Sequence, residues 1–128
     1  MAVTVTNSTI TAFDTITTVT SNAATADVDG TAEVFTITPT KAGHRCVLII
    51  GGTGSAADGN ISYSVAAGDF WASVAVTGTV TKNTEKMIEL ETAKIMQNDG
   101  TIAVTLTPAA TDKLKTDHTA YVKFIELR

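Results

Sequence analysis

Apolar and polar residues alternate with a period of two along most of the chain, which is the pattern of strands with one buried face. In 61–66 the apolar Ile61, Tyr63 and Val65 alternate with serine and alanine, and similar alternation occurs at 2–6, 34–38, 102–106 and 120–127. Turn signals rich in Gly, Asp, Asn and Pro separate these segments at roughly ten-residue intervals. The pattern predicts an all-β fold, a jelly-roll-like antiparallel β-sandwich with eight or nine short strands.

One stretch departs from the alternation. Residues 46–50, Cys-Val-Leu-Ile-Ile, form a continuous apolar run, which predicts a central strand with both faces buried. The run leads into Gly51-Gly-Thr-Gly54, which resembles the phosphate-binding turn of a dinucleotide fold. Such a turn must open a helix whose first amides bind the pyrophosphate. Residues 60–65 instead read as a strand, so we interpret 51–59 as a loop and not as a nucleotide site.

Three regions have less definite patterns. Residues 84–96 contain good helix formers, and Thr84 could cap a helix. The competing interpretation is a hairpin that turns at Lys82–Glu85 with Ile88 and Leu90 on one face, and the surrounding strands favour it. Residues 109–118 are predicted as a polar loop or a short helical turn. Residues 1–7 form a lone strand ahead of an irregular stretch.

Length and composition indicate one domain, 1–128, of an ordinary globular kind. The chain has 128 residues and 44% hydrophobic residues, and threonine, a β-former, is its commonest residue. The net charge of −4 and the scattered nine Lys and Arg argue against nucleic acid as a partner. We expect no membrane partner and synthesis in the cytoplasm, because there is neither a signal peptide nor an apolar run approaching about 18 residues.

The residue types that carry chemistry are few and scattered. Cys46 is the lone cysteine and lies within the apolar run, so we interpret it as a small buried residue. His44 and His118 are far apart in the sequence and are expected to be solvated loop residues. Asp27-Val-Asp-Gly30 lacks the strongest ligands of a calcium loop and is interpreted as a turn. We therefore predict no catalytic residues, no cofactor and no metal site, and expect that the protein is not an enzyme.

The adjacent aromatic residues Phe70 and Trp71 are the most informative side-chain pair. Neighbours in a strand point to opposite faces, so one of the two is expected in the core and the other at a partner surface. We predict interface residues at Val3, Val5, Phe70 and Trp71. The competing function for the aromatic pair is a sugar-binding platform.

Three turn-and-strand segments resemble segments of small structural proteins of tailed bacteriophages, in particular capsid decoration (cement) proteins of the jelly-roll type. They are Ala66-Ala-Gly-Asp-Phe-Trp-Ala72, Thr77-Gly-Thr-Val-Thr-Lys82 and Asn98-Asp-Gly-Thr-Ile-Ala-Val-Thr-Leu-Thr-Pro108. The resemblance implies a homotrimer on the outer surface of the virion capsid, made in the host cytoplasm, which bridges subunits of the major capsid protein. It also implies that Met1–Asn7 extends as an arm to a neighbour. The alternative is a non-catalytic binding module, carbohydrate-recognising or adhesive, of a phage tail or cell surface.

Overall fold

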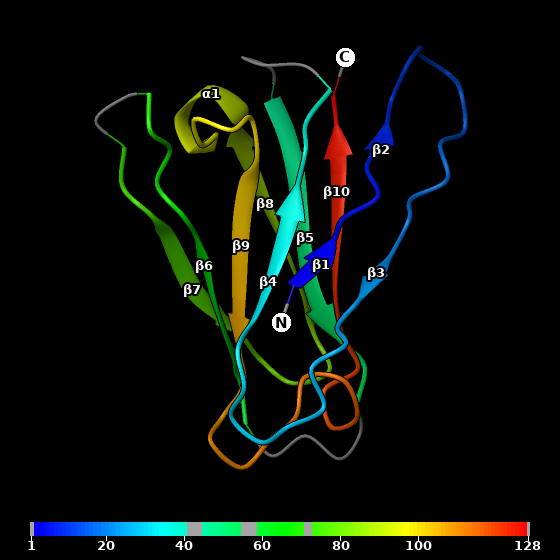
Figure 1. The fold of residues 1–128 in the computed structure, drawn as a ribbon. Coiled ribbons are helices and arrows are strands. Elements are labelled where there is room, and N and C mark those ends of the chain that lie inside the picture. Colours follow the sequence, from blue (N-terminus) through cyan, green and yellow to red (C-terminus); the bar gives the residue numbers. More distant parts are fainter. Residues whose placement is uncertain (1, 41–44, 55–58, 71–72, 128) are drawn as a thin grey trace.

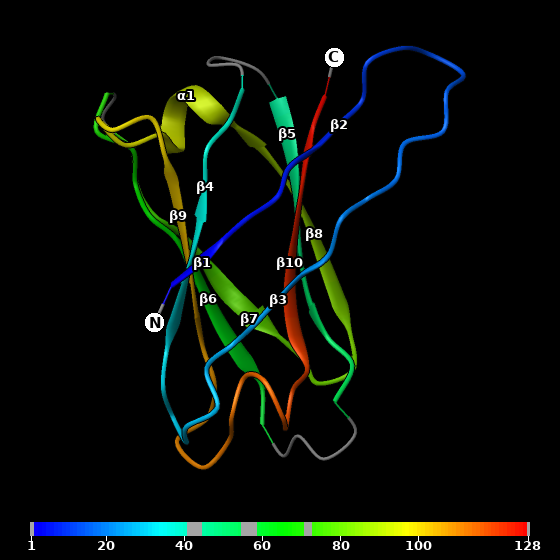
Figure 2. The same ribbon diagram turned by 45° about the vertical axis from the view of Figure 1, so that its right-hand side comes forward.

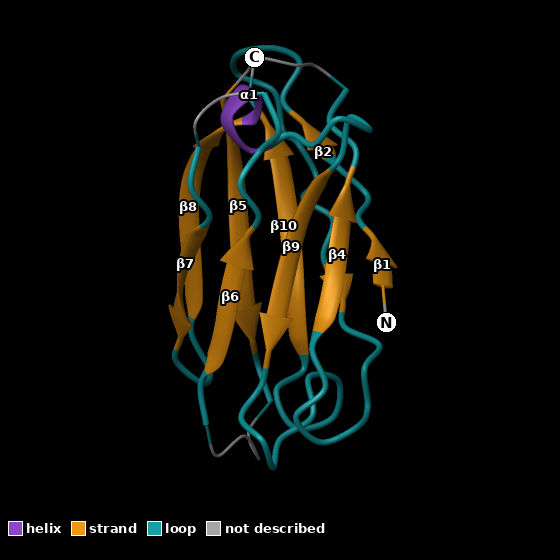
Figure 3. Cartoon of the chain, turned by 60° about the vertical axis from the view of Figure 1, so that its left-hand side comes forward, coloured by secondary structure: helices purple, strands orange, loops and turns teal. Residues whose placement is uncertain are grey.

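The computed structural model describes residues 2–40, 45–54, 59–70 and 73–127, which form two sheets packed face to face (Figures 1 and 3). One short helix, α1 (Thr92–Ile95), lies at one end of the sandwich. The strands are β1 (Ala2–Thr4), β2 (Ser8–Thr9), β3 (Asn22–Ala23), β4 (Glu33–Ile37), β5 (Arg45–Gly52), β6 (Ile61–Val65), β7 (Val76–Val80), β8 (Glu85–Glu91), β9 (Ile102–Thr107) and β10 (Ala120–Glu126).

The strand order confirms the predicted β-sandwich. The first sheet has the order β1-β4-β9-β6-β7, and the second has the order β2-β10-β5-β8 with β3 also paired to β10. The described residues form ten strands instead of eight or nine. The sheets are mixed and not purely antiparallel, because the two short N-terminal strands run parallel to their neighbours, β1 to β4 and β2 to β10.

The core lies between the sheets and is built from the inward positions of the alternating strands. Along β4, β9 and β10 every second residue is buried, as the alternation predicted. Burying a large aliphatic or aromatic side chain contributes about 1.5–3 kcal/mol, so this layer supplies most of the stabilisation. The largest apolar side chains in it are Phe35, Phe124, Ile37, Leu48, Ile50, Ile61, Ile102, Leu106 and Leu114.

The prediction that both faces of the apolar run are buried is only half right. Cys46, Leu48 and Ile50 are buried between the sheets, whereas Val47 and Ile49 are half-buried. The physical reason is that a two-layer sandwich covers one face of each sheet and leaves the other outward. The run therefore places two aliphatic side chains on the outer face of the second sheet.

The segment predicted as a hairpin forms strands that do not pair with each other. β7 pairs with β6 in the first sheet, whereas β8 pairs with β5 in the second. The turn between them, with Asn83 at a φ of 57°, is a corner that carries the chain from one sheet to the other. Ile88 and Leu90 do share the inward face of β8, as predicted. The helix forms at α1, and 109–118 folds into successive turns.

The N-terminal residues form part of the sandwich. β1 pairs with β4, and Val5 is only 6% exposed, with its amide donating to the carbonyl of Thr36 at 2.9 Å. Asn7 donates to the carbonyl of Thr38 at 2.7 Å. Within the described residues 2–7 there is thus no free arm of the kind expected at 1–7. The segment that projects from the body is instead the loop 10–21 between β2 and β3 (Figure 2).

Two buried carboxylates fasten the irregular segments to the sheets. Glu33, which is fully buried on β4, accepts hydrogen bonds from the amides of Thr25 and Ala26 at 2.8 and 3.1 Å and from the Thr25 hydroxyl. Glu126 on β10 accepts from the amide and hydroxyl of Thr40 in the same way. A buried carboxylate is tolerated because donors replace its lost water.

We expect Glu33→Gln to lower the free energy of unfolding by about 2 kcal/mol, because an amide cannot accept at both of its positions and lacks the charge that strengthens these bonds. The measurement is urea unfolding followed by far-UV circular dichroism. Glu89→Gln, on an exposed side chain, is the matched control and should change stability by less than about 0.5 kcal/mol. Equal stability of the two variants would contradict the role assigned to Glu33.

Candidate functional site

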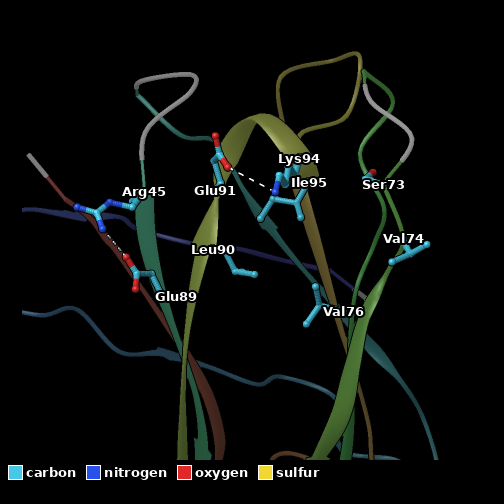
Figure 4. Close-up of a pocket in the computed structure, with 9 residues that line it drawn as sticks. All are labelled: Arg45, Ser73, Val74, Val76, Glu89, Leu90, Glu91, Lys94 and Ile95. Carbon is cyan, nitrogen blue, oxygen red and sulfur yellow. Dashed lines mark hydrogen bonds and ion pairs between the residues drawn. The ribbon is translucent and has the colours of Figure 1, made fainter.

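A groove opens at the side of the sandwich where the edge strands β7 and β8 belong to different sheets (Figure 4). Its volume is about 580 Å³. β7 supplies one wall, β8 and α1 supply the other, and the side chains of Val76 and Leu90 lie between them. Its lining residues are Arg45, Ser73, Val74, Val76, Glu89, Leu90, Glu91, Lys94 and Ile95.

The groove has an apolar interior and a charged rim. Arg45 pairs with Glu89 at 3.2 Å, and Lys94 pairs with Glu91 at 3.8 Å. All four side chains are about half exposed or more, so these ion pairs contribute little to stability. The hydroxyl of Ser73 donates to the carbonyl of Gly68 at 3.2 Å. This lining can accept an apolar group, and it holds no pairing of a nucleophile with a base.

The outer face of the second sheet forms a second candidate surface. In the registers of β10, β5 and β8, Ile125 pairs with Val47, and Ile49 pairs with Met87. Paired residues on adjacent strands project from the same face of a sheet, so these four side chains form one apolar patch, here called the outer patch. Met87 is 74% exposed and the others are half-buried. Charged residues flank it, among them Lys123, Glu85 and Glu89.

The three described residues of the four predicted at an interface, Val3, Val5 and Phe70, do not share one exposed surface. Val5 lies in the core, and Val3 packs against it from a half-buried position on β1. Phe70 is 56% exposed, which leaves it able to contact a partner. Trp71 lies outside the described residues, so the prediction that the two aromatic side chains face opposite ways stays a prediction.

The glycines of the nucleotide-like motif serve backbone packing. A side chain at Gly54 would overlap the carbonyl oxygen of Asp117, and one at Gly52 would come within 2.7 Å of the carbonyl oxygen of His118. The amide of Gly54 also donates to the His118 carbonyl at 2.8 Å. Here glycine permits the close approach of two backbones. β6 follows as a strand, but the connection is shorter than the interpreted 51–59, because β5 continues through Gly52, where it still pairs with β10.

Gly51 has a separate role on the outer face. Gly51 of β5 is paired with both Tyr121 of β10 and Glu85 of β8, and a Cβ at this glycine would lie 2.5 Å from the tyrosine hydroxyl. The ring therefore crosses the glycine, and its hydroxyl donates to Glu85. Burial and this bond raise the pKa of Tyr121 to about 12. The bonds from Tyr121 and then from Lys123 lower the pKa of Glu85.

Cys46 is buried, as predicted. Its thiol is 1% exposed and donates to the carbonyl of Leu90 at 3.4 Å. Burial, together with the negative charge of Glu126, raises the pKa of the thiol from 9.0 to about 12. A reactive thiol needs the opposite shift, because the thiolate is the nucleophile. Cys46 is thus part of the core.

The expectation of a solvated histidine was wrong for His118, whereas His44 lies outside the described residues. The imidazole is 1% exposed, and its Nε2 lies 3.0 Å from Oδ2 of Asp112, which is itself 3% exposed. The same carboxylate oxygen accepts from the amide of Gly59 at 3.0 Å. The pair ties the turns at 109–118 to the start of the β6 segment. The sequence could not predict this contact, because two residues six positions apart in an irregular loop have no fixed spatial relation.

Within the described ranges, no group of three or more His, Cys, Asp or Glu side chains is placed to hold a metal ion. The one helix of that part of the chain is far too short to cross a membrane, and no other described segment is a helix that could span one.

Comparisons with known protein families, with curated proteins and with solved structures find no match. The functional argument therefore rests on the sequence resemblance given above and on the surfaces just described.

We expect Gly54→Ala to destabilise the fold by about 3 kcal/mol, because the added methyl group overlaps the backbone carbonyl oxygen of Asp117, in the turn that leads into β10. Thr53→Ala, at the exposed neighbouring position, should change stability by less than about 0.5 kcal/mol. Thermal and urea unfolding of both variants measure the difference. Unaltered stability of Gly54→Ala would show that the glycine is kept for another reason.

We expect the Cys46 thiol to react with an aromatic disulfide reagent far more slowly in the folded protein than in urea. At pH 8 a pKa near 12 instead of 9.0 reduces the thiolate fraction by roughly a thousandfold. Because the pKa of the thiol is higher in the folded protein than in the unfolded chain, its contribution to stability is complete below pH 9 and declines as the pH rises toward 12. Labelling at the unfolded rate under native conditions would contradict the burial.

Proposed function

We propose that this protein is a structural virion component that decorates and stabilises a bacteriophage capsid by bridging subunits of the major capsid protein. The proposal is supported by the resemblance of residues 66–72, 77–82 and 98–108 to capsid decoration proteins and by the distribution of apolar surface. On this proposal the protein is not an enzyme, and it acts through contact surfaces at the capsid exterior.

The observation that carries the proposal is the outer patch. In a strand with one buried face, outward positions are normally polar, yet Val47 and Ile49 continue the apolar run of β5 on the outward side. Ile125 and Met87 extend the patch to both neighbouring strands. An apolar centre with a charged rim is the composition of a protein interface. We infer that this flat face lies against the major capsid protein.

A decoration protein stabilises a shell by linkage. A protein that binds the assembled capsid more tightly than its dissociated subunits shifts the equilibrium toward assembly. The resemblance implies a homotrimer, and three linked copies on neighbouring capsid subunits would convert weak single contacts into strong attachment. A surface of four aliphatic or thioether side chains suits such repeated contacts of moderate strength. The acidic chain is not suited to nucleic acid as a partner.

The competing function, a sugar-binding or adhesive module, finds less support in the described residues. Carbohydrate sites use aromatic rings as platforms, and the lining of the groove contains only aliphatic, charged and serine side chains. Binding to a glycan array that is lost in Trp71→Ala would favour this competing function over the capsid proposal.

We expect the purified protein to cosediment with expanded capsids from its source phage in a saturable manner, and Met87→Asp to reduce the affinity by roughly tenfold or more, because it places a charge in the outer patch. Val28→Asp is the matched control: it introduces the same charge at another exposed aliphatic position, 60% exposed, and should bind as the parent does. Capsid pelleting with quantitative gel analysis measures all three.

One outcome would overturn the decoration proposal, and a second would overturn only the assignment of the contact surface. A parent protein that stays in the supernatant at saturating capsid concentrations would exclude capsid decoration. Equal binding by Met87→Asp and Val28→Asp would leave decoration intact and exclude the outer patch as the surface that contacts the capsid.

A further inference from the structure

Residues 15–20 have the composition of a strand but belong to no sheet of the described structure. The run Thr-Ile-Thr-Thr-Val-Thr consists of six consecutive β-branched residues, which favour extended, paired backbone. It lies in the projecting loop between β2 and β3, beyond a turn at which Asp14 has a φ of 55° (Figure 2). Ile16 is completely exposed, at 102%. The strand-forming composition of residues 15–20 therefore conflicts with their unpaired conformation in the single chain. This segment is here called the loop strand.

The two halves of the loop are held differently. In the outgoing half, Ile10 and Phe13 line a hollow together with Arg45 and Leu127, so this half remains close to its own chain. The loop strand forms the returning half and is fastened at its far end, where the amide of Thr20 donates to the hydroxyl of Ser8 at 2.9 Å. Ile16 and the residues around it project from the body.

The opposite side of the molecule carries an unpaired sheet edge without protection. Among the described residues, β7 is the last strand of the first sheet and pairs only with β6. Proteins usually guard such edges with charged residues or proline, and the adjacent edge strand β8 follows this rule with Glu85, Lys86, Glu89 and Glu91. β7 has the sequence Val-Thr-Gly-Thr-Val, with neither charge nor proline. Its backbone is open to another strand.

The loop strand cannot reach this edge within one chain. It leaves the sandwich at the side of β2 and β3, whereas β7 lies at the other end of the first sheet (Figures 1 and 2). The two features can meet only between copies. A contact between different surfaces of identical chains is heterologous, and it closes into a ring or continues as a chain according to the angle between copies.

We propose that residues 15–20 of one copy pair with the exposed edge of β7 of a second copy, and that Ile16 enters the groove between β7 and β8. Six extended residues span about 20 Å, enough to cover the five residues of β7. Backbone hydrogen bonds would supply binding energy, and the apolar pocket would set the register, as in other cases of strand addition. Val76, Leu90 and Ile95 form the apolar lining that Ile16 would contact.

The charge distribution allows a second copy of the chain to occupy this edge. Two chains of net charge −4 repel each other, and a contact between them is most favourable where charge is absent or balanced. The loop strand and β7 are uncharged. The groove rim carries two cations and two anions, so Asp14, next to the loop strand, meets a rim of zero net charge that includes Lys94 and Arg45. This inference concerns the free protein and holds whether or not the protein binds a capsid.

The test is the mass of the protein in solution, measured by light scattering over a range of concentrations. The parent should associate beyond the monomer. Ile16→Asp should weaken association by roughly 30-fold or more, because it places a charge in an apolar groove. Thr77→Lys combined with Thr79→Lys should do the same from the other side, because it adds to β7 the charges that edge strands use against pairing. Val28→Asp should associate as the parent does.

A mixture of the two defective proteins makes the test specific for this contact. Ile16→Asp keeps an intact β7 edge, and the double lysine variant keeps an intact loop strand, so the mixture should form a heterodimer that neither variant forms alone. A parent that is monomeric throughout, variants that associate like the parent, or a mixture that stays monomeric would each overturn the proposal. Thermal unfolding of every variant confirms that the fold is intact.

Discussion

The structure depends on the close approach of β5 and β10. These two strands pair over seven residues, and β10 also pairs with β2 and β3, so the second sheet and the N-terminal segment are assembled around it. At the end of β5 the register requires positions without side chains, because the backbone at 117–118 lies directly against Gly52 and Gly54. Backbone packing alone therefore explains the glycines at the end of β5, although a similar Gly-rich sequence pattern occurs in nucleotide-binding turns.

This arrangement also determines which polar groups can be buried. The segment that leads into β10 carries His118, and its imidazole meets Asp112 inside the sandwich end, where the carboxylate also holds the amide of Gly59. At the other end of β10, Glu126 receives the amide and hydroxyl of Thr40. The buried carboxylates and the imidazole named here thus all have hydrogen-bond partners within the fold. Their chemistry is used to close loops onto sheets, which leaves the contact surfaces as the features that need a functional explanation.

The apolar run marked β5, and the two-residue strands β2 and β3 are too short to show a period. The other strands were predictable from the sequence because a two-layer sandwich imposes period-two alternation on them. The partners of the strands were not. The pattern around β7 and β8 contains two strands and a tight turn, and nothing local distinguishes a hairpin from a corner between sheets. Glu33 occupies an inward position of β4, and its donors come from Thr25 and Ala26, which only the tertiary fold brings near. The apolar run of β5 predicted burial of both faces of the strand, whereas in the single chain its outward residues Val47 and Ile49 are only half-buried.

The two proposed contact surfaces have different physical characters, and this matters for an assembly. The outer patch is a rigid sheet face that can meet a partner without reorganising, so its binding loses little conformational entropy. The loop strand has no paired neighbour among the described residues of its own chain, so fixing its backbone against β7 costs conformational entropy, which reduces the net gain from each contact between copies. If both proposals hold, contacts between copies should be weak in dilute solution. They should strengthen once the outer patch places neighbouring copies side by side, because attachment to one surface raises the effective concentration of one copy near the next.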